Sequence, residues 1–288
     1  MLITKDERHF FDIPETIYTE NARYELSDSL GAGGNSCVWE CLDNEGQSYA
    51  IKFQLNLNEQ SKKRFLQEIK LHSQLKHKHI IQYIDSGEVD SFEQTKNGSR
   101  KCKIPFIIME KAEKNLFEYI EEHNKIVYSE YIQQFLGLSD ALAELHKVAV
   151  HRDLKLENIL IVGDRWVIGD FGLCSFLDDN HEDLTRMNEK VGPKYWMSPE
   201  AINRLYNKSI DITPASDVFQ MAAIFWFVVN ARFPLGIVTN NDWGSDDLEI
   251  CNVLLLGLQH NSEARIQSGT DLHNDIENVV STIRSGKK

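Results

Sequence analysis

The chain has 288 residues and is poor in several features that define whole classes of protein. It has only 6 prolines and no Pro-rich tract, so no such linker marks a domain boundary. Its longest apolar run, residues 218–229, is well short of the roughly 20 residues of a membrane-spanning helix, so we expect a buried core helix there. The N-terminus lacks a positive region followed by an apolar stretch, and we expect no signal peptide.

Cysteine pairs and positive charge are also scarce. The 5 cysteines are an odd number without a C-x-x-C pair, which favours a reduced, cytoplasmic protein without a zinc site. The net charge is −13, whereas binding of nucleic acid needs clustered Lys and Arg. We therefore expect no nucleic-acid partner and no membrane partner. A small phosphate ligand is compatible with this charge, because a few cations and backbone N–H groups suffice to bind it.

The first part of the chain has the pattern of an antiparallel sheet. Residues 23–53 contain short β-prone runs separated by Gly, Asp and Asn, and residues 61–76 have apolar residues at helical spacing. Two more strand-like runs, 79–89 and 104–112, flank the polar segment 93–101, which we expect to be a loop. Five strands and one helix predict an N-terminal lobe of about 110 residues.

The pattern changes after this lobe. Residues 116–123, 131–146 and 217–230 have the spacing of helices, and short loop-and-strand segments between them carry the unusual motifs. We therefore expect a mainly α-helical C-terminal lobe.

A glycine-rich turn joins two of the predicted strands. In LGAGGNSCVWE, Gly31, Gly33 and Gly34 precede Val38. Such a run is often a plain hairpin turn, and its place between two strands excludes a Rossmann fingerprint. Backbone N–H groups without side-chain bulk can nevertheless approach phosphate oxygens closely.

A lysine and a glutamate follow this turn. Lys52 ends a predicted strand in YAIK, and Glu68 lies on the predicted helix. Each by itself is most simply a solvated charge. Together they could form an ion pair that holds the lysine at nucleotide phosphates.

The segment HRDLKLEN concentrates charge between apolar neighbours. Asp153 could accept or orient a hydroxyl proton, Lys155 could neutralise a transferring phosphoryl group, and Asn158 could offer a neutral oxygen to a cation. Asp170 in DFG could add a second oxygen ligand for Mg²⁺, although an acidic strand end is the simpler interpretation. A surface loop would explain the charges but not the apolar flanks, so an active-site loop is favoured.

In order, these motifs resemble those of eukaryotic-type protein kinases, more the Ser/Thr type than the Tyr type. The Gly-loop, A-I-K, helix glutamate, H-R-D-L-K-x-x-N, D-F-G and S-P-E occur over about residues 30–217. The resemblance implies an α+β, two-lobed fold with a five-stranded antiparallel sheet and one helix in the N-lobe and a mainly α-helical C-lobe. We expect one kinase domain over residues 1–288, with its N-lobe at about 20–110, hinge at 110–113 and C-lobe at 114–288.

The resemblance also implies an ATP- and Mg²⁺-dependent enzyme that phosphorylates Ser/Thr hydroxyls of protein substrates and itself. Asp153 would be the catalytic base, and Lys155 would contact the γ-phosphate. Lys52 and Glu68 would be the pair that holds the phosphates. The magnesium ligands would be Asn158 and Asp170. The nucleotide would be bound by Gly31, Ala32, Gly33, Gly34, Val38, Ala50, Lys52, Met109, Glu110, Ala112 and Leu160.

Some features depart from the family pattern. Pro193 stands where Ser/Thr kinases usually carry threonine, whereas Lys155 is a Ser/Thr signature, so we favour Ser/Thr specificity with dual specificity as the alternative. Residues 173–191 would be the activation loop, with Thr185 and Ser175 as candidate phosphoacceptors.

The end of the chain resembles a shortened C-lobe. Residues 246–258 and 271–283 can supply two further helices, and Arg265 or Arg284 would pair with Glu200. The C-lobe is either trimmed or covered by a regulatory protein, which exposed Val279, Val280 and Ile283 would favour.

Two other functions are weighed against an active protein kinase. A pseudokinase that acts as a scaffold would usually lack the equivalent of Lys52, Asp153 or Asp170, and all three are present. A small-molecule phosphotransferase would generally lack the segment from D-F-G to S-P-E, which holds a peptide. We therefore favour the protein kinase.

Overall fold

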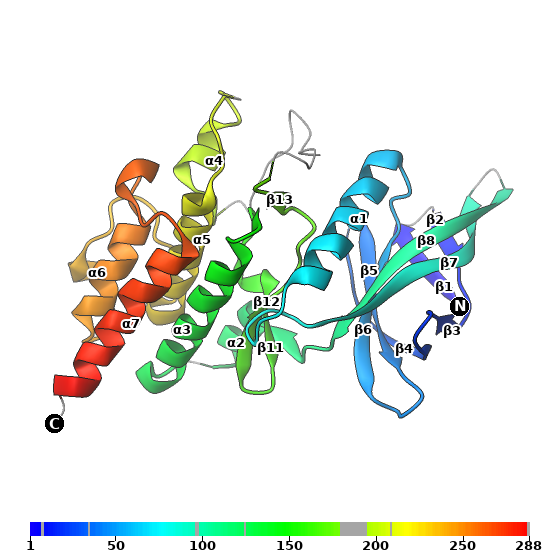
Figure 1. Ribbon diagram of the computed structural model, residues 1–288, viewed down its shortest axis with the longest axis horizontal. Helices are drawn as coiled ribbons and strands as arrows, with labels where there is room; N and C mark the ends of the chain where they lie inside the picture. Colours follow the sequence, from blue (N-terminus) through cyan, green and yellow to red (C-terminus); the bar gives the residue numbers. More distant parts are fainter. Residues whose placement is uncertain are drawn as a thin grey trace. The chain divides into compact units, whose positions relative to one another are not determined.

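A computed structural model describes residues 1–6, 9–33, 35–95, 98–123, 125–178, 195–207 and 209–286. The chain forms two compact units, shown in Figure 1. The N-terminal unit consists of Met1–Lys76 and Ile81–Ala112, and the C-terminal unit of His77–Ile80 and Glu113–Lys288. The first unit is mainly a sheet and the second mainly helices, which confirms the α+β kinase fold.

The N-terminal unit is built on one antiparallel sheet. In the described residues its strand order is β1-β2-β7-β8-β6-β5-β4-β3. The strands expected from the sequence are β4 (Arg23–Ala32), β5 (Ser36–Leu42), β6 (Ser48–Gln54), β7 (Tyr83–Thr95) and β8 (Gly98–Glu110).

Three further strands, which the sequence analysis missed, extend this sheet. β1 (Leu2–Asp6) and β2 (His9–Asp12) form a hairpin beside β7, and β3 (Thr16–Tyr18) pairs with β4. Their buried residues belong to the core of this unit, together with alternate residues of the central strands. The apolar residues that the N-terminal segment adds to the core are Ile3, Phe11, Ile13 and Ile17.

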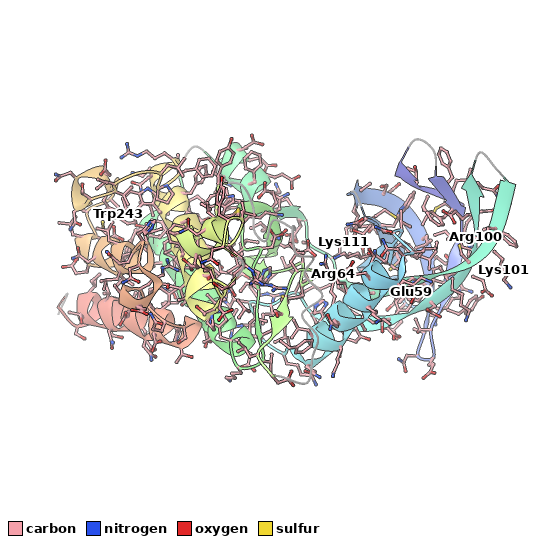
Figure 2. The ribbon with its side chains drawn as sticks, turned by 90° about the horizontal axis from the view of Figure 1, so that it is seen from above. Glu59, Arg64, Arg100, Lys101, Lys111 and Trp243 are labelled. Carbon is pink, nitrogen blue, oxygen red and sulfur yellow. The ribbon has the colours of Figure 1, made fainter. Side chains whose placement is uncertain are left out.

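The prediction of a loop over 93–101 is wrong for the part of this segment that the structure describes. β7 and β8 continue as one long hairpin, in which Glu93 lies opposite Arg100 and Thr95 opposite Gly98. Arg100 donates to the Glu93 carboxylate at 2.6 Å, and Figure 2 shows Arg100 near the hairpin end. Cross-strand ion pairs and the neighbouring β2 stabilise strands that are too polar to be recognised from periodicity.

The helix predicted at 61–76 is α1 (Glu59–Gln74). Asn58 caps it, because its side chain accepts the backbone N–H of Ser61 at 2.8 Å. The side chains that α1 buries are Phe65, Glu68, Leu71 and His72, whereas Leu66, which supported the prediction, is exposed.

The C-terminal unit contains the predicted helices. These are α2 (Leu116–Glu122), α3 (Tyr128–Leu145), α5 (Pro214–Asn230), α6 (Leu248–Gly257) and α7 (Gly269–Gly286), with the shorter α4 (Pro199–Asn203). The short strands are β9 (Lys114–Asn115), β10 (Ala149–Val150), β11 (Ile159–Val162), β12 (Arg165–Ile168) and β13 (Ser175–Phe176). α5 is buried along most of its length, as its apolar composition predicts. Within the described chain, no helix is both long enough and apolar enough to cross a membrane.

The last helix, α7, directs much of its apolar face towards the rest of the C-terminal unit. α7 packs against α3, which buries Val280 and half-buries Val279 and Ile283. The condition under which these side chains would favour a regulatory protein, their exposure to solvent, is therefore not met for Val280 and only partly met for Val279 and Ile283. The argument for a regulatory protein over this helix loses its support with it.

Candidate active site

The charged segment lies between buried elements of the C-terminal unit. β10 precedes it, a turn of 3-10 helix at Leu156–Asn158 follows, and the β11–β12 hairpin continues the chain. Val150 and Ile159 on its two sides are buried. The apolar flanks thus fix both ends of a polar loop.

Asp217, which is 0% exposed in the first turn of α5, holds the backbone of this loop. Its carboxylate accepts the backbone N–H groups of His151 at 2.6 Å and Arg152 at 2.7 Å. Arg152 has a left-handed backbone (φ 69°), which costs a non-glycine residue about 1–3 kcal/mol. The two hydrogen bonds to Asp217 offset this cost.

Two further side chains that support the loop were not found from the sequence. The His146 Nε2 atom lies 3.1 Å from the Asp217 carboxylate, while its Nδ1 accepts the Gly269 N–H at 2.9 Å. Gln220 accepts the N–H of Leu154 at 3.1 Å. His146 caps the C-terminus of α3 and Gln220 lies in α5, and only the fold brings these two side chains to the loop.

Three predicted site residues meet within the loop. The Asp153 Oδ2 atom accepts from Lys155 Nζ at 2.9 Å and from Asn158 Nδ2 at 3.0 Å. Because Asn158 Nδ2 also donates to the Asp153 backbone oxygen at 2.7 Å, the amide orientation is set, and Oδ1 is the atom left to offer a cation. A nearly buried carboxylate thus accepts hydrogen bonds from the Lys155 ammonium group and from the Asn158 amide N–H.

His151 connects this loop to the segment that carries Asp170. Its Nε2–H donates to the Gly169 carbonyl at 3.1 Å, and its Nδ1 accepts the Asp153 N–H at 3.3 Å. Gly169 N–H donates to the Asn158 backbone oxygen at 2.9 Å. A Cβ at Gly169 would lie 2.8 Å from a methyl group of Leu160, so glycine permits this close approach.

Asp170 follows directly, with an exposed side chain and a left-handed backbone (φ 55°). Aspartate tolerates this conformation better than most residues. Carboxylate and amide oxygens from Asp170 and Asn158 suit Mg²⁺, which keeps waters and takes phosphate oxygens as its other ligands. Among the described residues, no group of three or more His, Cys, Asp or Glu forms a metal site.

The N-terminal unit contains the predicted ion pair. Lys52 on β6 and Glu68 on α1 lie 2.7 Å apart, Nζ to Oε1, with both side chains largely buried. The sheet register sets Lys52 opposite Val38 and Ala50 opposite Met109. The predicted adenine contacts Val38, Ala50 and Met109 therefore lie on three adjacent strands.

The glycine-rich turn closes the β4–β5 hairpin of the same unit. Gly31 lies opposite Val38 and Ala32 opposite Cys37, and Gly33 N–H donates to the Ser36 carbonyl at 2.8 Å. Gly34 lies outside the described residues. A Cβ at Gly31 would meet nothing within 4 Å, so packing within the fold does not require glycine there.

The predicted hinge residues continue from β8. Glu110 ends that strand and Ala112 ends the N-terminal unit, both half-buried. Between them, Lys111 donates to Glu40 on β5 at 2.6 Å, and Ser48 donates to the same carboxylate oxygen at 2.5 Å. The hydrogen bond from Lys111 has the largest effect and that from Ser48 the next largest, and they hold the pKa of Glu40 below its ordinary value.

The residues expected in the activation loop are described only in part. Ser175 lies in β13, and Arg152 donates from Nε to the Leu173 carbonyl at 2.8 Å. Thr185 and Pro193 lie outside the described residues.

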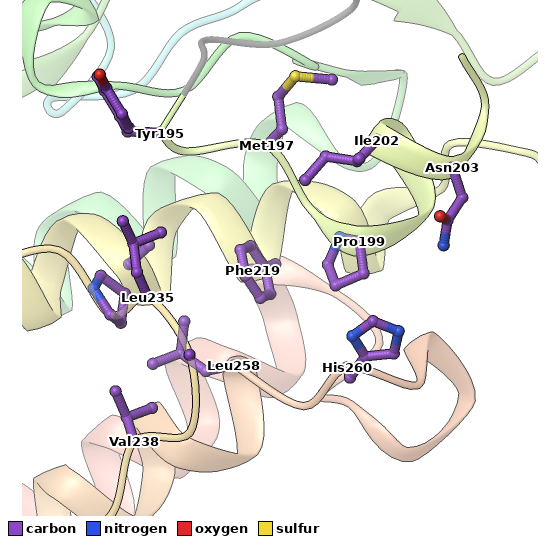
Figure 3. A pocket seen from close by; sticks show the side chains of 13 residues that line it. Tyr195, Met197, Pro199, Ile202, Asn203, Phe219, Leu235, Val238, Leu258 and His260 are labelled. Carbon is purple, nitrogen blue, oxygen red and sulfur yellow. The ribbon is translucent and has the colours of Figure 1, made fainter. Parts of the chain in front are cut away.

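An apolar pocket of about 350 Å³ lies beside the S-P-E segment, within the C-terminal unit (Figure 3). It is formed by α4, α5, the end of α6 and the segment 234–238. Its lining residues are Tyr195, Met197, Pro199, Ile202, Asn203, Phe219, Ala223, Pro234, Leu235, Gly236, Val238, Leu258 and His260. On its rim, Leu235 is 63% exposed, which leaves an apolar surface open to a partner.

A buried ion pair holds Glu200, the glutamate of the S-P-E segment. Arg265 donates from both terminal nitrogens to the Glu200 carboxylate, at 2.6 and 3.0 Å, which decides the pairing left open between Arg265 and Arg284. Ser216 donates to Glu200 at 2.7 Å. Burial alone would raise the pKa of Glu200, but the hydrogen bonds from Arg265 and Ser216 outweigh it and lower the pKa.

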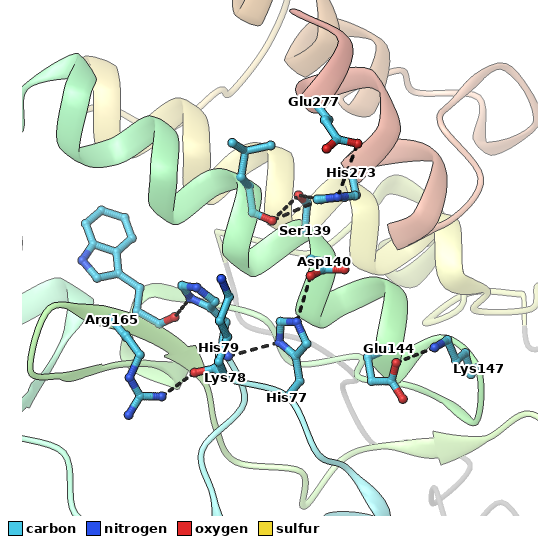
Figure 4. A network of polar contacts seen from close by, with 12 residues as sticks. His77, Lys78, His79, Ser139, Asp140, Glu144, Lys147, Arg165, His273 and Glu277 are labelled. Carbon is cyan, nitrogen blue, oxygen red and sulfur yellow. Dashed lines mark hydrogen bonds and ion pairs between the residues drawn. The ribbon is translucent and has the colours of Figure 1, made fainter. Parts of the chain in front are cut away.

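A polar network holds residues 77–80 to the C-terminal unit, as Figure 4 shows. His77 Nε2 lies 3.0 Å from Asp140 on α3, and His79 Nδ1 donates to the Trp166 carbonyl at 2.7 Å. Gly137 allows the His79 ring to lie against α3, because a Cβ there would be 2.2 Å from the ring.

Comparison with known proteins agrees with this geometry. A family model described as the protein kinase domain matches residues 24–283. The chain is 28% identical over 219 residues to the probable serine/threonine-protein kinase PknB of Corynebacterium glutamicum, covering 74% of this chain and 32% of that protein. It is 30% identical over 253 residues to serine/threonine-protein kinase tousled-like 2 of Xenopus tropicalis, covering 81% and 34%. This chain spans about a third of the length of these relatives. It belongs to the eukaryotic-type serine/threonine protein kinase family.

Proposed function

We propose that this chain is an active protein kinase that transfers the γ-phosphate of ATP to Ser and Thr hydroxyls of protein substrates. The observation that carries this proposal is the arrangement around Asp153, whose carboxylate lies 2.9 Å from Lys155 Nζ and 3.0 Å from Asn158 Nδ2. Phosphoryl transfer needs little beyond positioning and charge neutralisation, and these residues supply both.

Each residue of the loop takes a separate part. Asp153 accepts or orients the proton of the substrate hydroxyl, and Lys155 neutralises charge on the phosphoryl group. Asn158 and Asp170 hold Mg²⁺, which supplies charge neutralisation at the phosphates when it is bound. The hydrogen bonds of Asp217 and His151 keep the loop in this geometry without rearrangement during the reaction.

The N-terminal unit supplies the nucleotide contacts in this proposal. Lys52, held by Glu68, binds the phosphates, and the glycine-rich turn at residues 31–34 covers them. Val38 and Ala50 contact the adenine ring, with Met109 and the backbone of 110–112 beside it. Leu160 lies on β11 of the C-terminal unit, and its contact with adenine stays a prediction. We propose that both units act as one kinase domain over residues 1–288, in the cytoplasm, and that the chain also phosphorylates itself.

Lys52→Met is expected to lower kcat/KM for ATP by about 10²-fold or more, because Glu68 then holds no cation for the phosphates. Initial rates of radiolabelled phosphate transfer measure the effect. Lys101→Met is the control, since Lys101 is 66% exposed on the β7–β8 hairpin. Equal rates for both variants would show that Lys52 has no part in transfer.

The pocket beside Pro199 is proposed to receive an apolar side chain of the protein substrate, because it continues the segment that holds a peptide in this family. Leu235→Asp should raise KM for a protein substrate about 5-fold or more and leave KM for ATP unchanged. Leu256→Asp, at another exposed leucine outside the pocket lining, should change neither. An unchanged protein KM in Leu235→Asp would exclude this pocket as a substrate contact.

A further inference from the structure

The helix that carries Glu68 is held by few apolar side chains. Of the four residues that α1 buries, Phe65 and Leu71 are apolar, whereas Glu68 and His72 are polar. An amphipathic helix of this length ordinarily buries a broader apolar stripe. The two buried polar residues therefore contribute to holding α1 on the sheet.

We propose that His72 is a positioning residue for the Lys52–Glu68 pair, acting through a buried hydrogen bond that ties α1 to the chain entering β7. The bond joins His72 Nε2 to the Ile81 carbonyl at 2.6 Å. Because a carbonyl only accepts, Nε2 carries the proton. The proposal rests on the proposed function of Lys52 and Glu68.

Helix geometry places the two polar contacts on one face. Glu68 and His72 are four residues apart, so their side chains lie one above the other on the side facing the sheet. Glu68 meets Lys52 on β6, and His72 meets the backbone before β7. Contacts to two separate parts of the sheet restrict both the rotation of α1 and its shift along its axis.

The surroundings of His72 favour one orientation and a neutral ring. Its ring packs edge-on against Tyr83, with centroids 5.7 Å apart, and Tyr83 lies opposite Met109 in the sheet. Burial lowers the pKa of His72 to about 4, with a smaller contribution in the same direction from the charge of Lys52, and the hydrogen bond to Ile81 opposes this shift only in part. A neutral ring at position 72 does not compete with Lys52 for the Glu68 carboxylate, whereas a cationic side chain there would.

The proposal is tested with His72→Leu, which keeps apolar bulk but removes the donor. We expect kcat/KM for ATP to fall about 10-fold, with KM for a protein substrate unchanged. His72→Gln should recover most of this loss, because its terminal amide can place an N–H where Nε2 lies. His72→Asn is too short to do so and should resemble His72→Leu.

His79→Leu is the matched control. His79 is also a buried histidine that donates to a backbone carbonyl, but it belongs to the C-terminal unit, whereas Glu68 belongs to the N-terminal unit. The variant His79→Leu should have a lower melting temperature than the wild type, with kcat/KM for ATP within about 2-fold of the wild-type value. An equal loss of kcat/KM in His72→Leu and His79→Leu, or no rescue by His72→Gln, would overturn the proposal.

A second measurement separates this proposal from the proposed function. The effects of His72→Leu and Glu68→Gln on thermal unfolding should be non-additive, because both act through the position of α1. This double-mutant cycle measures stability and needs no catalysis. It therefore tests the role of His72 even if the wild type transfers no phosphate. Additive effects would show that His72 does not position Glu68.

Discussion

Asp170→Asn is expected to lower Mg²⁺-dependent phosphate transfer by at least about 10³-fold while the fold is retained. Asparagine tolerates the left-handed backbone of Asp170 (φ 55°), so a loss of activity would reflect the missing carboxylate charge and not strain. Asp170→Ala should be equally inactive but slightly less stable. Both variants are measured by initial rates at several Mg²⁺ concentrations.

The control for this prediction is Asp164→Ala, which removes an exposed carboxylate from the turn between β11 and β12. It should transfer phosphate at the wild-type rate. Unchanged transfer by Asp170→Asn at low Mg²⁺ would refute the assignment of Asp170 as a metal ligand. A circular dichroism melt of each variant checks that the fold is intact.

Arg265→Met is expected to produce the largest loss of stability, about 3–5 kcal/mol. The Arg265 side chain is 0% exposed, and its removal leaves the buried Glu200 carboxylate without its cation. It also removes the hydrogen bonds to the carbonyl oxygens of Ala215 and Gln259. The melting temperature should fall by about 10 °C.

Two further variants and a pH series test whether the unpaired buried charge of Glu200 causes this loss of stability. Arg232→Met breaks an exposed pair with Asp242, 3.9 Å apart, and should cost less than about 1 kcal/mol. The double variant Arg265→Met with Glu200→Gln should regain part of the loss, because no charge is then left buried. A double variant no more stable than Arg265→Met would contradict the buried-charge explanation.

The pH dependence follows from the lowered pKa of Glu200. A carboxylate whose pKa is lower in the folded state than in the unfolded state stabilises the fold above its ordinary value of 4.5, and this contribution is lost as the pH falls through the folded pKa. In Arg265→Met the burial of Glu200 is no longer opposed by Arg265, so its pKa should rise. The stability difference between wild type and variant should therefore shrink from pH 7 towards pH 4.

Much of the C-terminal unit could be predicted because its signals are local. Helical spacing located α3, α5 and α7 to within a few residues, and HRDLKLEN lies within one loop, so Asp153, Lys155 and Asn158 had to be neighbours. Lys52 and Glu68 are 16 residues apart, and their contact followed from the family resemblance, since spacing alone left them as solvated charges.

Features that depend on distant contacts could not be predicted in this way. β2 pairs with β7, about eighty residues later in the chain, and without this neighbour the outer half of the β7–β8 hairpin has the pattern of a polar loop. The choice between Arg265 and Arg284 required the position of α7, which places Arg265 before the helix beside Glu200 and leaves Arg284 exposed in the last turn. His72 fitted the helical pattern of α1 and gave no signal of its hydrogen bond to Ile81.

The role of Asp153 in phosphate transfer is most directly tested by mass spectrometry of the wild type and Asp153→Asn after incubation with ATP, Mg²⁺ and a mixture of Ser/Thr-containing peptides. Asparagine keeps the size of Asp153 but cannot accept the hydroxyl proton. We expect phosphoserine and phosphothreonine on the peptides or on the chain itself with the wild type, and a reduction of at least about 10³-fold with Asp153→Asn. Equal phosphorylation by both proteins, or a wild type that binds ATP and phosphorylates neither the peptides nor itself, would contradict the assignment of this loop as a kinase active site.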